Sequence, residues 1–323
     1  MYKKIFTKIN NFKTVYIFPY SNSSKYLATK IKKKIIFVDN FTSIKSNLIR
    51  PKKIIDAKDN IIIFTDSNKS LYNELFKIKK ISLNIKDPDV IKSIIDLDKL
   101  KIKENNLSKL FLKFNTDKGK YFKSYGFRNK AHNYSKFYVR NLSHLKNKKI
   151  NILEIGTYRG DAAAAFISYF KKSNLVTIDN RKKLRFKSKR IKFYKIDYLN
   201  KIQQKKFIQK YKNFFDIIID DGGHYKSHNI KNLKIFFVCL KKKSFYIIED
   251  ISYYHPNIDD AKNELKMIRI LQKLNSKKFF KSNILNKKFQ NLLMTNINDI
   301  QLYQGDWEKN GRNISNICFI RMK

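Results

Sequence analysis

The sequence predicts an α/β protein with two domains, and three observations support this. Apolar runs of strand length alternate with helix-length segments along most of the chain, which is typical of parallel sheets. Two such runs, Phe215–Asp220 and Tyr246–Ile248, flank a helix-length segment over 227–241, so they predict neighbouring parallel strands. A chain of 323 residues with 42% hydrophobic content can also bury more than one core.

The first alternation predicts a small parallel α/β domain over residues 1–90. Its strand-like and helix-like segments follow one another at 14–18, 23–31, 34–39, 60–64 and 69–77. The turn over 19–24 lacks the glycines that let a dinucleotide-binding loop approach pyrophosphate, although Asp39 ends the second strand as a ribose-binding acid would. The domain resembles small Rossmann-like modules attached to sugar-modifying enzymes, with a degenerate phosphate loop. We expect it to serve as a scaffold or to dock a partner.

Residues 91–148 are predicted to form a helical linker and lid. Apolar residues recur at helical spacing over 91–112. Two polar segments follow, 115–119 and 131–134, and the second opens a helix that continues through Leu145. We expect these segments to fold over the edge of the main sheet.

The main domain begins with a strand over 149–155, and Gly156, Gly160 and an alanine-rich helix over 161–170 come next. A strand, two glycines four residues apart and a helix are typical of loops that hold nucleotide-like ligands near a helix N-terminus. The sequence therefore predicts a cofactor loop at this position.

Acidic residues lie at or near the carboxyl ends of the successive strands. Asp179 ends the second strand 25 residues after Glu154, a position suited to accepting hydrogen bonds from ribose hydroxyls, and Asp197 ends the third. A single strand-terminal Asp is as often a helix cap as a ligand. Four successive strands that all carry acids favour a binding site.

The next two strands deliver Asp221, Glu249 and Asp250 to one sheet edge, since Glu249 follows Asp221 by 28 residues across one helix-length segment. Three hard oxygen ligands favour Mg²⁺, and His224, three residues after Asp221, could act as a base beside it. The alternative is a tight Asp-Gly-Gly-His turn in which Asp221 caps the following helix. A cap explains neither the imidazole nor the distant acid pair.

The net charge of +45 raises the alternative of a nucleic-acid or anionic-membrane partner. The excess comes from 61 Lys against 10 Arg, spread along the whole chain, whereas phosphate-binding surfaces cluster charge and favour the arginine fork. Abundant Ile, Asn, Phe and Tyr beside the lysines fit an AT-rich coding sequence. We therefore attribute much of the charge to genome composition and do not expect nucleic acid as a partner.

The rest of the composition predicts a soluble, cytoplasmic protein. No run of about 18 apolar residues occurs, and the N-terminus lacks the apolar core of a secretion signal. The two cysteines, Cys239 and Cys318, lie in apolar segments and are expected to be buried thiols. The final strands, 299–303 and 317–321, are predicted to form a hairpin. The oligomeric state is left open, with a homo-oligomer as one alternative.

Several motifs together resemble those of class I S-adenosylmethionine-dependent methyltransferases, and in particular metal-dependent sugar O-methyltransferases of macrolide and rhamnose decoration and the related cephalosporin hydroxylase-like group. The first motif is Leu153–Gly160, preceded by Thr116–Gly119 and His132–Tyr134. Asp221–His224 and the pair Glu249–Asp250 complete the pattern. The resemblance covers roughly residues 105–270 and departs from the family at Tyr158, where a glycine is usual.

The resemblance implies a Rossmann-like methyltransferase domain over 149–323, with a mostly parallel seven-stranded sheet and an antiparallel C-terminal edge. It implies S-adenosyl-L-methionine bound by the first motif and by strand-terminal acids, at Glu154, Gly156, Tyr158, Gly160, Asp179, Asp197 and Asp220. The implied Mg²⁺ ligands are Asp221, Glu249 and Asp250, with His224 as the base. The implied acceptor contacts are Thr116, Lys118, His132, Tyr134 and His255.

These assignments predict an O-methyltransferase that acts on a sugar hydroxyl of a glycan, glycolipid or glycosylated metabolite. A sugar hydroxyl is a poor nucleophile until its proton is withdrawn, which is the task that a metal ion and a base would share. Two alternatives remain: an oxidative enzyme like the cephalosporin hydroxylase-like relatives, and a non-catalytic basic protein that binds nucleic acid on a methyltransferase scaffold.

Overall fold

The computed structural model describes five strands before residue 94 by their backbone, and then residues 94–323 except 125–126, 181–183, 198–199, 224, 252–260, 262, 310–311 and 314. The chain divides into two compact units. The first comprises Met1–Lys92 and Lys123–Phe127, and the second comprises Ser93–Phe122 and Arg128–Lys323.

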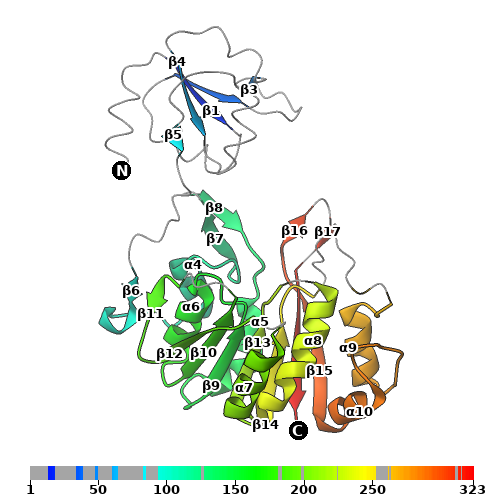
Figure 1. The fold of residues 1–323 in the computed structure, drawn as a ribbon. Coiled ribbons are helices and arrows are strands. Elements are labelled where there is room, and N and C mark those ends of the chain that lie inside the picture. Colours follow the sequence, from blue (N-terminus) through cyan, green and yellow to red (C-terminus); the bar gives the residue numbers. More distant parts are fainter. Residues whose placement is uncertain are drawn as a thin grey trace. The chain divides into compact units, whose positions relative to one another are not determined.

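The first unit contains a five-stranded sheet in the order β3-β2-β1-β4-β5 (Figure 1). Its strands are β1 (Thr14–Phe18), β2 (Lys34–Val38), β3 (Leu48–Ile49), β4 (Asn60–Phe64) and β5 (Leu83–Asn84). All four pairings are parallel, as the sequence predicted. The helices predicted at 23–31 and 69–77, the turn over 19–24 and Asp39 lie outside the described residues.

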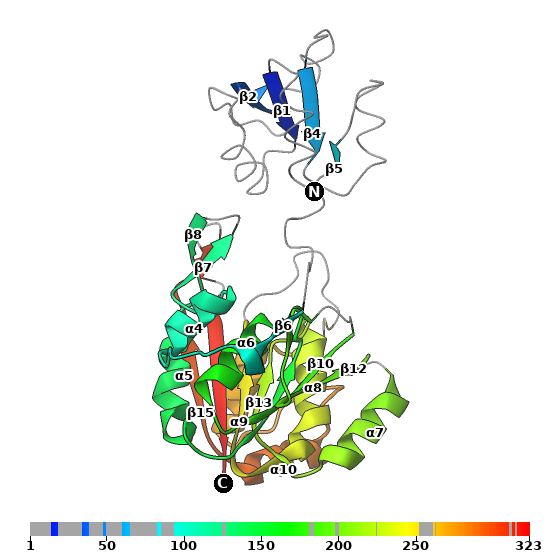
Figure 2. The same cartoon turned by 90° about the vertical axis from the view of Figure 1, so that its left-hand side faces the viewer.

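The second unit is built on a seven-stranded sheet in the order β12-β10-β9-β13-β14-β18-β15 (Figures 1 and 2). Its strands are β9 (Asn151–Ile155), β10 (Asn174–Asp179), β12 (Ile191–Lys195), β13 (Phe215–Asp220), β14 (Leu240–Ile248), β15 (Ile297–Gln304) and β18 (Asn316–Met322). Strand β18 runs antiparallel to both of its neighbours, and the other pairings are parallel. The predicted parallel sheet with an antiparallel C-terminal edge is confirmed.

Helices cover both faces of this sheet, because its central strands are apolar on both sides. In β13, Ile217 and Ile219 pack into one core and Ile218 into the other, as the two-residue period of a strand requires. The first core includes residues of α4 (Leu107–Phe114), α5 (Ser135–Leu142) and α6 (Asp161–Tyr169). The second includes residues of α7 (Lys201–Tyr211), α8 (Lys226–Phe236), α9 (Met267–Asn275) and α10 (Lys287–Asn296).

The prediction of one helix over 91–112 is wrong for residues 94–106. Strand β6 (Ile95–Asp96) pairs with β11 (Phe186–Lys187), and the 3₁₀ turn η2 (Leu97–Lys99) follows it. The α-helix begins at Leu107, because the Asn106 side chain accepts a hydrogen bond from the Lys109 amide and caps it. Tertiary pairing with β11 therefore overrides the helical spacing of the apolar residues.

The predicted linker and the C-terminal segment contain further short elements. Helix α5 and the 3₁₀ turn η3 (Ser143–Leu145) confirm the helix predicted to run through Leu145. Strands β7 (Tyr121–Ser124) and β8 (Phe127–Lys130) pair with each other, as do β16 (Glu308–Lys309) and β17 (Arg312–Asn313). None of the helices that the structure describes has the length and apolar character needed to cross a membrane.

The two cysteines are free and buried, as expected. Cys239 ends the 3₁₀ turn η4 (Phe237–Cys239), and Cys318 lies in β18. Burial raises the pKa of the Cys239 thiol to about 12 and raises the pKa of Cys318 as well. Both thiols are thus enclosed and protonated at neutral pH.

We expect the folded protein to resist thiol reagents. Raising the Cys239 pKa from 9.0 to about 12 lowers its thiolate fraction about 10³-fold, and only the thiolate is nucleophilic. Spectrophotometric titration with a disulfide reagent at pH 8 should show slow reaction in buffer and rapid reaction of both thiols in guanidinium chloride. A fast stoichiometric reaction of the folded protein would contradict the buried placement.

Candidate active site

Three neighbouring strands end at the same edge of the main sheet and bring the predicted acids there. Strand β13 pairs Asp220 with Ile155 of β9 on one side and with Ile248 of β14 on the other. The Asp221 amide donates to the Ile155 carbonyl at 2.9 Å, and the Glu249 amide donates to the Asp220 carbonyl at 3.0 Å. The residues that follow these strands therefore start from adjacent, fixed positions.

The predicted cofactor loop lies directly against the loop that follows β13. Gly156 has a φ of +84°, and a Cβ added there would lie 2.2 Å from the Asp221 carbonyl oxygen. Only glycine permits both this left-handed backbone and this approach. The backbone of the first motif is thus packed against the backbone of the Asp221 segment. The spacing of these motifs in the sequence does not predict that contact.

Two residues of the loop between Gly156 and α6 have a left-handed backbone conformation. Tyr158 has a φ of 50° and Gly160 a φ of 81°, and Gly160 directly precedes the first residue of α6. The Tyr158 amide donates to Asp179 Oδ2 at 2.8 Å, which ties the loop to the end of β10. The family's usual glycine would adopt this conformation without strain, and here a half-exposed tyrosine adopts it.

The other two predicted cofactor acids differ in their surroundings. Asp179 is half-buried at the end of β10, and its carbonyl accepts a hydrogen bond from the Ile196 amide at 3.0 Å. Asp197 is exposed just beyond β12, where its amide donates to the Gln203 side chain at 3.0 Å. Since β10 and β12 are parallel neighbours, both acids lie at the edge that carries the loop.

Glu154 is a buried acid with an unsatisfied oxygen. It is 1% exposed, and its Oε2 atom has no hydrogen-bond partner among the residues that the structure describes. Burial raises the pKa of Glu154 to about 8, and the charge of nearby Lys118 opposes that rise. A buried carboxylate oxygen without a partner is costly, and its position favours a ligand that would satisfy it.

Asp220, which the family resemblance placed at the cofactor, is instead enclosed by the protein. Its carboxylate accepts hydrogen bonds from the Gly222 amide, the Asn232 side chain and the Tyr246 hydroxyl. Burial raises the pKa of Asp220 to about 7. We therefore assign it to holding the turn after β13 rather than to contacting the cofactor.

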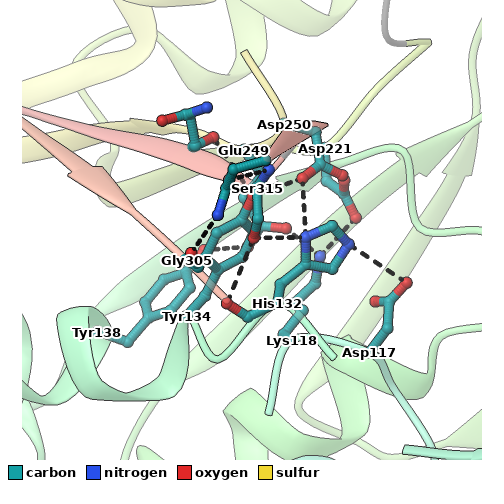
Figure 3. Close-up of polar contacts among 12 residues, drawn as sticks. Asp117, Lys118, His132, Tyr134, Tyr138, Asp221, Glu249, Asp250, Gly305 and Ser315 are labelled. Carbon is teal, nitrogen blue, oxygen red and sulfur yellow. Dashed lines mark hydrogen bonds and ion pairs between the residues drawn. The ribbon is translucent and has the colours of Figure 1, made fainter. Parts of the chain in front are cut away.

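Lys118 lies between two of the predicted metal ligands (Figure 3). Its Nζ donates to Asp221 Oδ2 at 2.6 Å and also to Glu249 Oε2. Lys118 is 3% exposed, and the two acids hold the pKa of this ammonium well above its usual range, against the effect of burial. It is therefore a buried, charged partner of these acids rather than a residue open to an acceptor.

Backbone hydrogen bonds hold the Lys118 segment in place. The segment follows α4, which ends where Asn115 adopts a left-handed conformation, and the amide of buried Thr116 donates to the Phe111 carbonyl at 3.0 Å. The carbonyls of residues 117, 118 and 119 accept hydrogen bonds from the amides of residues 132, 135 and 133, respectively. The two family-like segments that precede the first motif are thus paired with each other.

Asp250 belongs to a second cluster, around His132. Asp250 Oδ1 accepts a hydrogen bond from the Tyr134 hydroxyl at 2.5 Å and lies 3.3 Å from His132 Nδ1. The same nitrogen is 2.8 Å from Ser315 Oγ, and His132 Nε2 is 3.8 Å from Asp117 Oδ2. His132 and Tyr134 are both fully or nearly fully buried.

Sequence reasoning missed Tyr138, Asp117 and Ser315. Tyr138 donates to Glu249 Oε1 at 2.5 Å, and its place four residues after Tyr134 could have indicated a shared helix face. Asp117 belongs to the Thr116–Gly119 motif. No local signal marks Ser315, which reaches His132 from the far end of the chain.

Close backbone packing fixes the position of Ser315. A Cβ at Gly305 would lie 2.2 Å from the His132 carbonyl and 2.3 Å from Ser315 Oγ. The Trp307 ring packs edge-on against the His132 ring, with 4.4 Å between the ring centroids. His224 and His255, expected as the base and an acceptor contact, lie outside the described residues.

The acids suit a hard cation in their chemistry, although they are not arranged as a finished metal site. Glu154, Asp221, Glu249 and Asp250 supply carboxylate oxygens, the donors that Mg²⁺ prefers, and the unsatisfied Glu154 oxygen adds to this fit. Within the described residues, which omit His224 and His255, no three acidic, histidine or cysteine side chains are placed to hold a metal ion. Lys118 bridges two of the acids, and Asp250 contacts Tyr134 instead.

Comparison with solved structures identifies the fold. The methyltransferase MycE from the mycinamycin biosynthetic pathway, in complex with Mg, SAH and mycinamycin VI, matches 68% of this chain with a TM-score of 0.51 and 19% identity. A MycE complex with Mg and SAH gives a TM-score of 0.52 and 21% identity over the same share. The second unit has the class I methyltransferase fold.

This methyltransferase fold is supported by structure alone. The match covers 55% of the MycE chain, so this protein spans about half the length of that relative. No family model and no curated protein matches the sequence.

We expect Gly156→Ala to destabilise the second unit far more than Gly160→Ala does. Alanine at 156 would clash with the Asp221 backbone, and we expect a loss of about 3 kcal/mol or more in the free energy of unfolding. At 160 the φ is also positive, but the Cβ would meet only side-chain atoms, Leu184 Cδ2 at 3.1 Å and Thr157 Cγ2 at 3.9 Å, so a loss of about 1–2 kcal/mol is expected.

Urea unfolding of both variants, followed by circular dichroism, measures this difference. Gly160→Ala is the matched control, because it shares the left-handed conformation without the backbone clash. Equal losses in the two variants would show that the contact between the two loops does not constrain the site.

Proposed function

We propose that the second unit is an S-adenosylmethionine-dependent, Mg²⁺-assisted O-methyltransferase that acts on a sugar hydroxyl of a glycan, glycolipid or glycosylated metabolite. One observation carries the proposal: the backbone of Gly156, in the cofactor loop, lies against the backbone of Asp221, which begins the acid cluster. A methyl donor and an activated hydroxyl must meet in line, so the two binding regions have to adjoin.

The cofactor would be held by the loop after β9 and by the neighbouring strand end. Gly156 and Gly160 keep the backbone free of side chains beside the N-terminus of α6, and Asp179 offers a carboxylate suited to ribose hydroxyls. The half-exposed Tyr158 ring lies on the same loop, where it could cover the bound cofactor.

The acceptor would be activated at the acid cluster. A bound divalent cation supplies Lewis acidity that lowers the pKa of a coordinated hydroxyl, and Asp221, Glu249 and Asp250 would hold it. Lys118 stays protonated and cannot accept the proton. Burial likewise raises the pKa of Tyr134 and of Tyr138, so both hydroxyls act as donors to the acids.

These assignments leave His224 as the proposed base. It follows Asp221 by three residues, and an imidazole at that place could take the proton of a hydroxyl held at the cluster. The MycE complexes, which contain Mg and SAH and in one case mycinamycin VI, support the cofactor pair and a small-molecule acceptor. For the first unit we propose a scaffold or partner-docking role.

Calorimetric titration with S-adenosylmethionine tests the cofactor assignment. We expect saturable micromolar binding by the wild-type protein and roughly 10–100-fold weaker binding by Asp179→Ala, since a hydrogen bond to a charged group contributes about 1.5–3 kcal/mol. Asp197→Ala, at the exposed strand end, should weaken binding less. Absence of binding by the wild-type protein, with either Mg²⁺ or EDTA, would reject the methyltransferase assignment.

Methyl transfer to a panel of glycosylated acceptors tests the base. We expect His224→Ala to lower kcat by about 10²–10⁴-fold with unchanged cofactor affinity, and EDTA to abolish turnover until Mg²⁺ is restored. His144→Ala, on the 3₁₀ turn η3, is the matched histidine control and should retain full activity.

The same assays separate the alternatives. A strict requirement for iron and a 2-oxo acid would indicate an oxidative enzyme. Salt-sensitive binding to DNA or RNA without cofactor binding would indicate the nucleic-acid alternative.

A further inference from the structure

We infer that Lys118 is a built-in cation that competes with a divalent metal ion for the acid pair Asp221 and Glu249. The inference rests on the proposed metal site and adds a property of that site: the protein carries its own counter-ion, which a metal ion must displace. Metal affinity would then be set by a lysine that is not itself a ligand.

Lys118 already occupies the two acids that a metal ion would use, which is the first argument. Its ammonium donates to one oxygen of Asp221 and to one oxygen of Glu249, which come from the ends of two neighbouring strands. Lys118 and Glu249 are 3% and 1% exposed, so water screens this pair little. A divalent cation bound to the same two oxygens would face a full positive charge at short range in a medium of low dielectric constant.

The balance of charge between Lys118 and the acids around it is the second argument. Glu154 is also buried near Lys118 and Asp221, and no described residue is a hydrogen-bond partner of its Oε2 atom. The two acids that contact Lys118 outnumber its single ammonium, and one buried oxygen of Glu154 has no partner among the described residues. Lys118 therefore compensates the cluster only in part, and the remaining negative charge favours a cation of higher charge.

The anchoring of the segment indicates how displacement would occur. The backbone around Lys118 is fixed, because the carbonyls of residues 117–119 accept hydrogen bonds from the amides of residues 132, 133 and 135. The four-carbon stem of lysine is flexible, so its ammonium can leave the two oxygens by side-chain rotation alone. The metal-free and metal-bound forms would then share one backbone.

Mn²⁺ binding by the full-length protein tests the inference, with free Mn²⁺ measured by electron paramagnetic resonance at constant pH. We expect Lys118→Met to bind Mn²⁺ at least about tenfold more tightly than the wild type, because the competing charge is gone. Lys118→Arg keeps the charge and should bind no more tightly than the wild type. Lys136→Met, which removes a half-exposed lysine paired with Asp306 at 3.0 Å, is the surface control and should leave Mn²⁺ affinity unchanged.

Thermal unfolding supplies a second readout. In EDTA, Lys118→Met should have a lower Tm than the wild type, since its buried acids lack a counter-ion, and Mn²⁺ should raise its Tm more than it raises that of the wild type. If Lys118→Met folds only with metal, its affinity can be measured by withdrawing Mn²⁺ from the loaded protein with a chelator of known affinity.

Equal or weaker Mn²⁺ binding by Lys118→Met, or no binding by either protein, would overturn the inference. A failure of the proposed function would be detected in a different experiment, the titration of the wild-type protein with S-adenosylmethionine. Tighter Mn²⁺ binding without cofactor binding would reject the methyltransferase while leaving the competition intact.

Discussion

The parallel pairing of β9, β13 and β14 is the constraint on which the rest of the structure depends. Because of this pairing, the segments that follow Ile155, Asp220 and Ile248 all begin at one edge of the sheet. At that edge, the loop at Gly156 is in close contact with the Asp221 backbone. The strands are apolar on both faces, so burial beneath helices on each side holds this edge rigid. The register of these three strands therefore places the loop after β9 beside the acid cluster.

The site concentrates buried charge, and the fold compensates this charge at close range. Glu249 receives hydrogen bonds from Lys118 and Tyr138, and Asp250 receives one from Tyr134. Burying a carboxylate without such donors would cost several kcal/mol. The donors come from the segment ahead of the seven-stranded sheet, so the region predicted as a linker and lid supplies part of the polar interior of the site.

Particular residues show how far sequence reasoning reaches. Strand-terminal acids could be placed at one edge because parallel strands impose a common direction, and the structure brings Asp221 and Glu249 together there. The helix predicted over 91–112 is wrong for residues 94–106, because β6 pairs with β11 instead of forming helical hydrogen bonds. Asp220 could not be separated from Asp221 by sequence, since neighbouring residues of a strand point to opposite sides and only the burial around Asn232 and Tyr246 decides which is enclosed.

The sequence by itself determined the α/β class, the order of acid-bearing strands and the glycines of the loop after β9, because these follow from local periodicity and from backbone conformations that few residues adopt. Tertiary structure alone decided that Lys118 bridges Asp221 and Glu249 across 103 and 131 residues, and that Ser315 reaches His132 across 183. Such contacts depend on how segments that are distant in the sequence pack together, and no local sequence pattern predicts that packing. In the folded protein, the acids that the sequence predicted as metal ligands are therefore already in contact with a cation of the protein itself, the Lys118 ammonium.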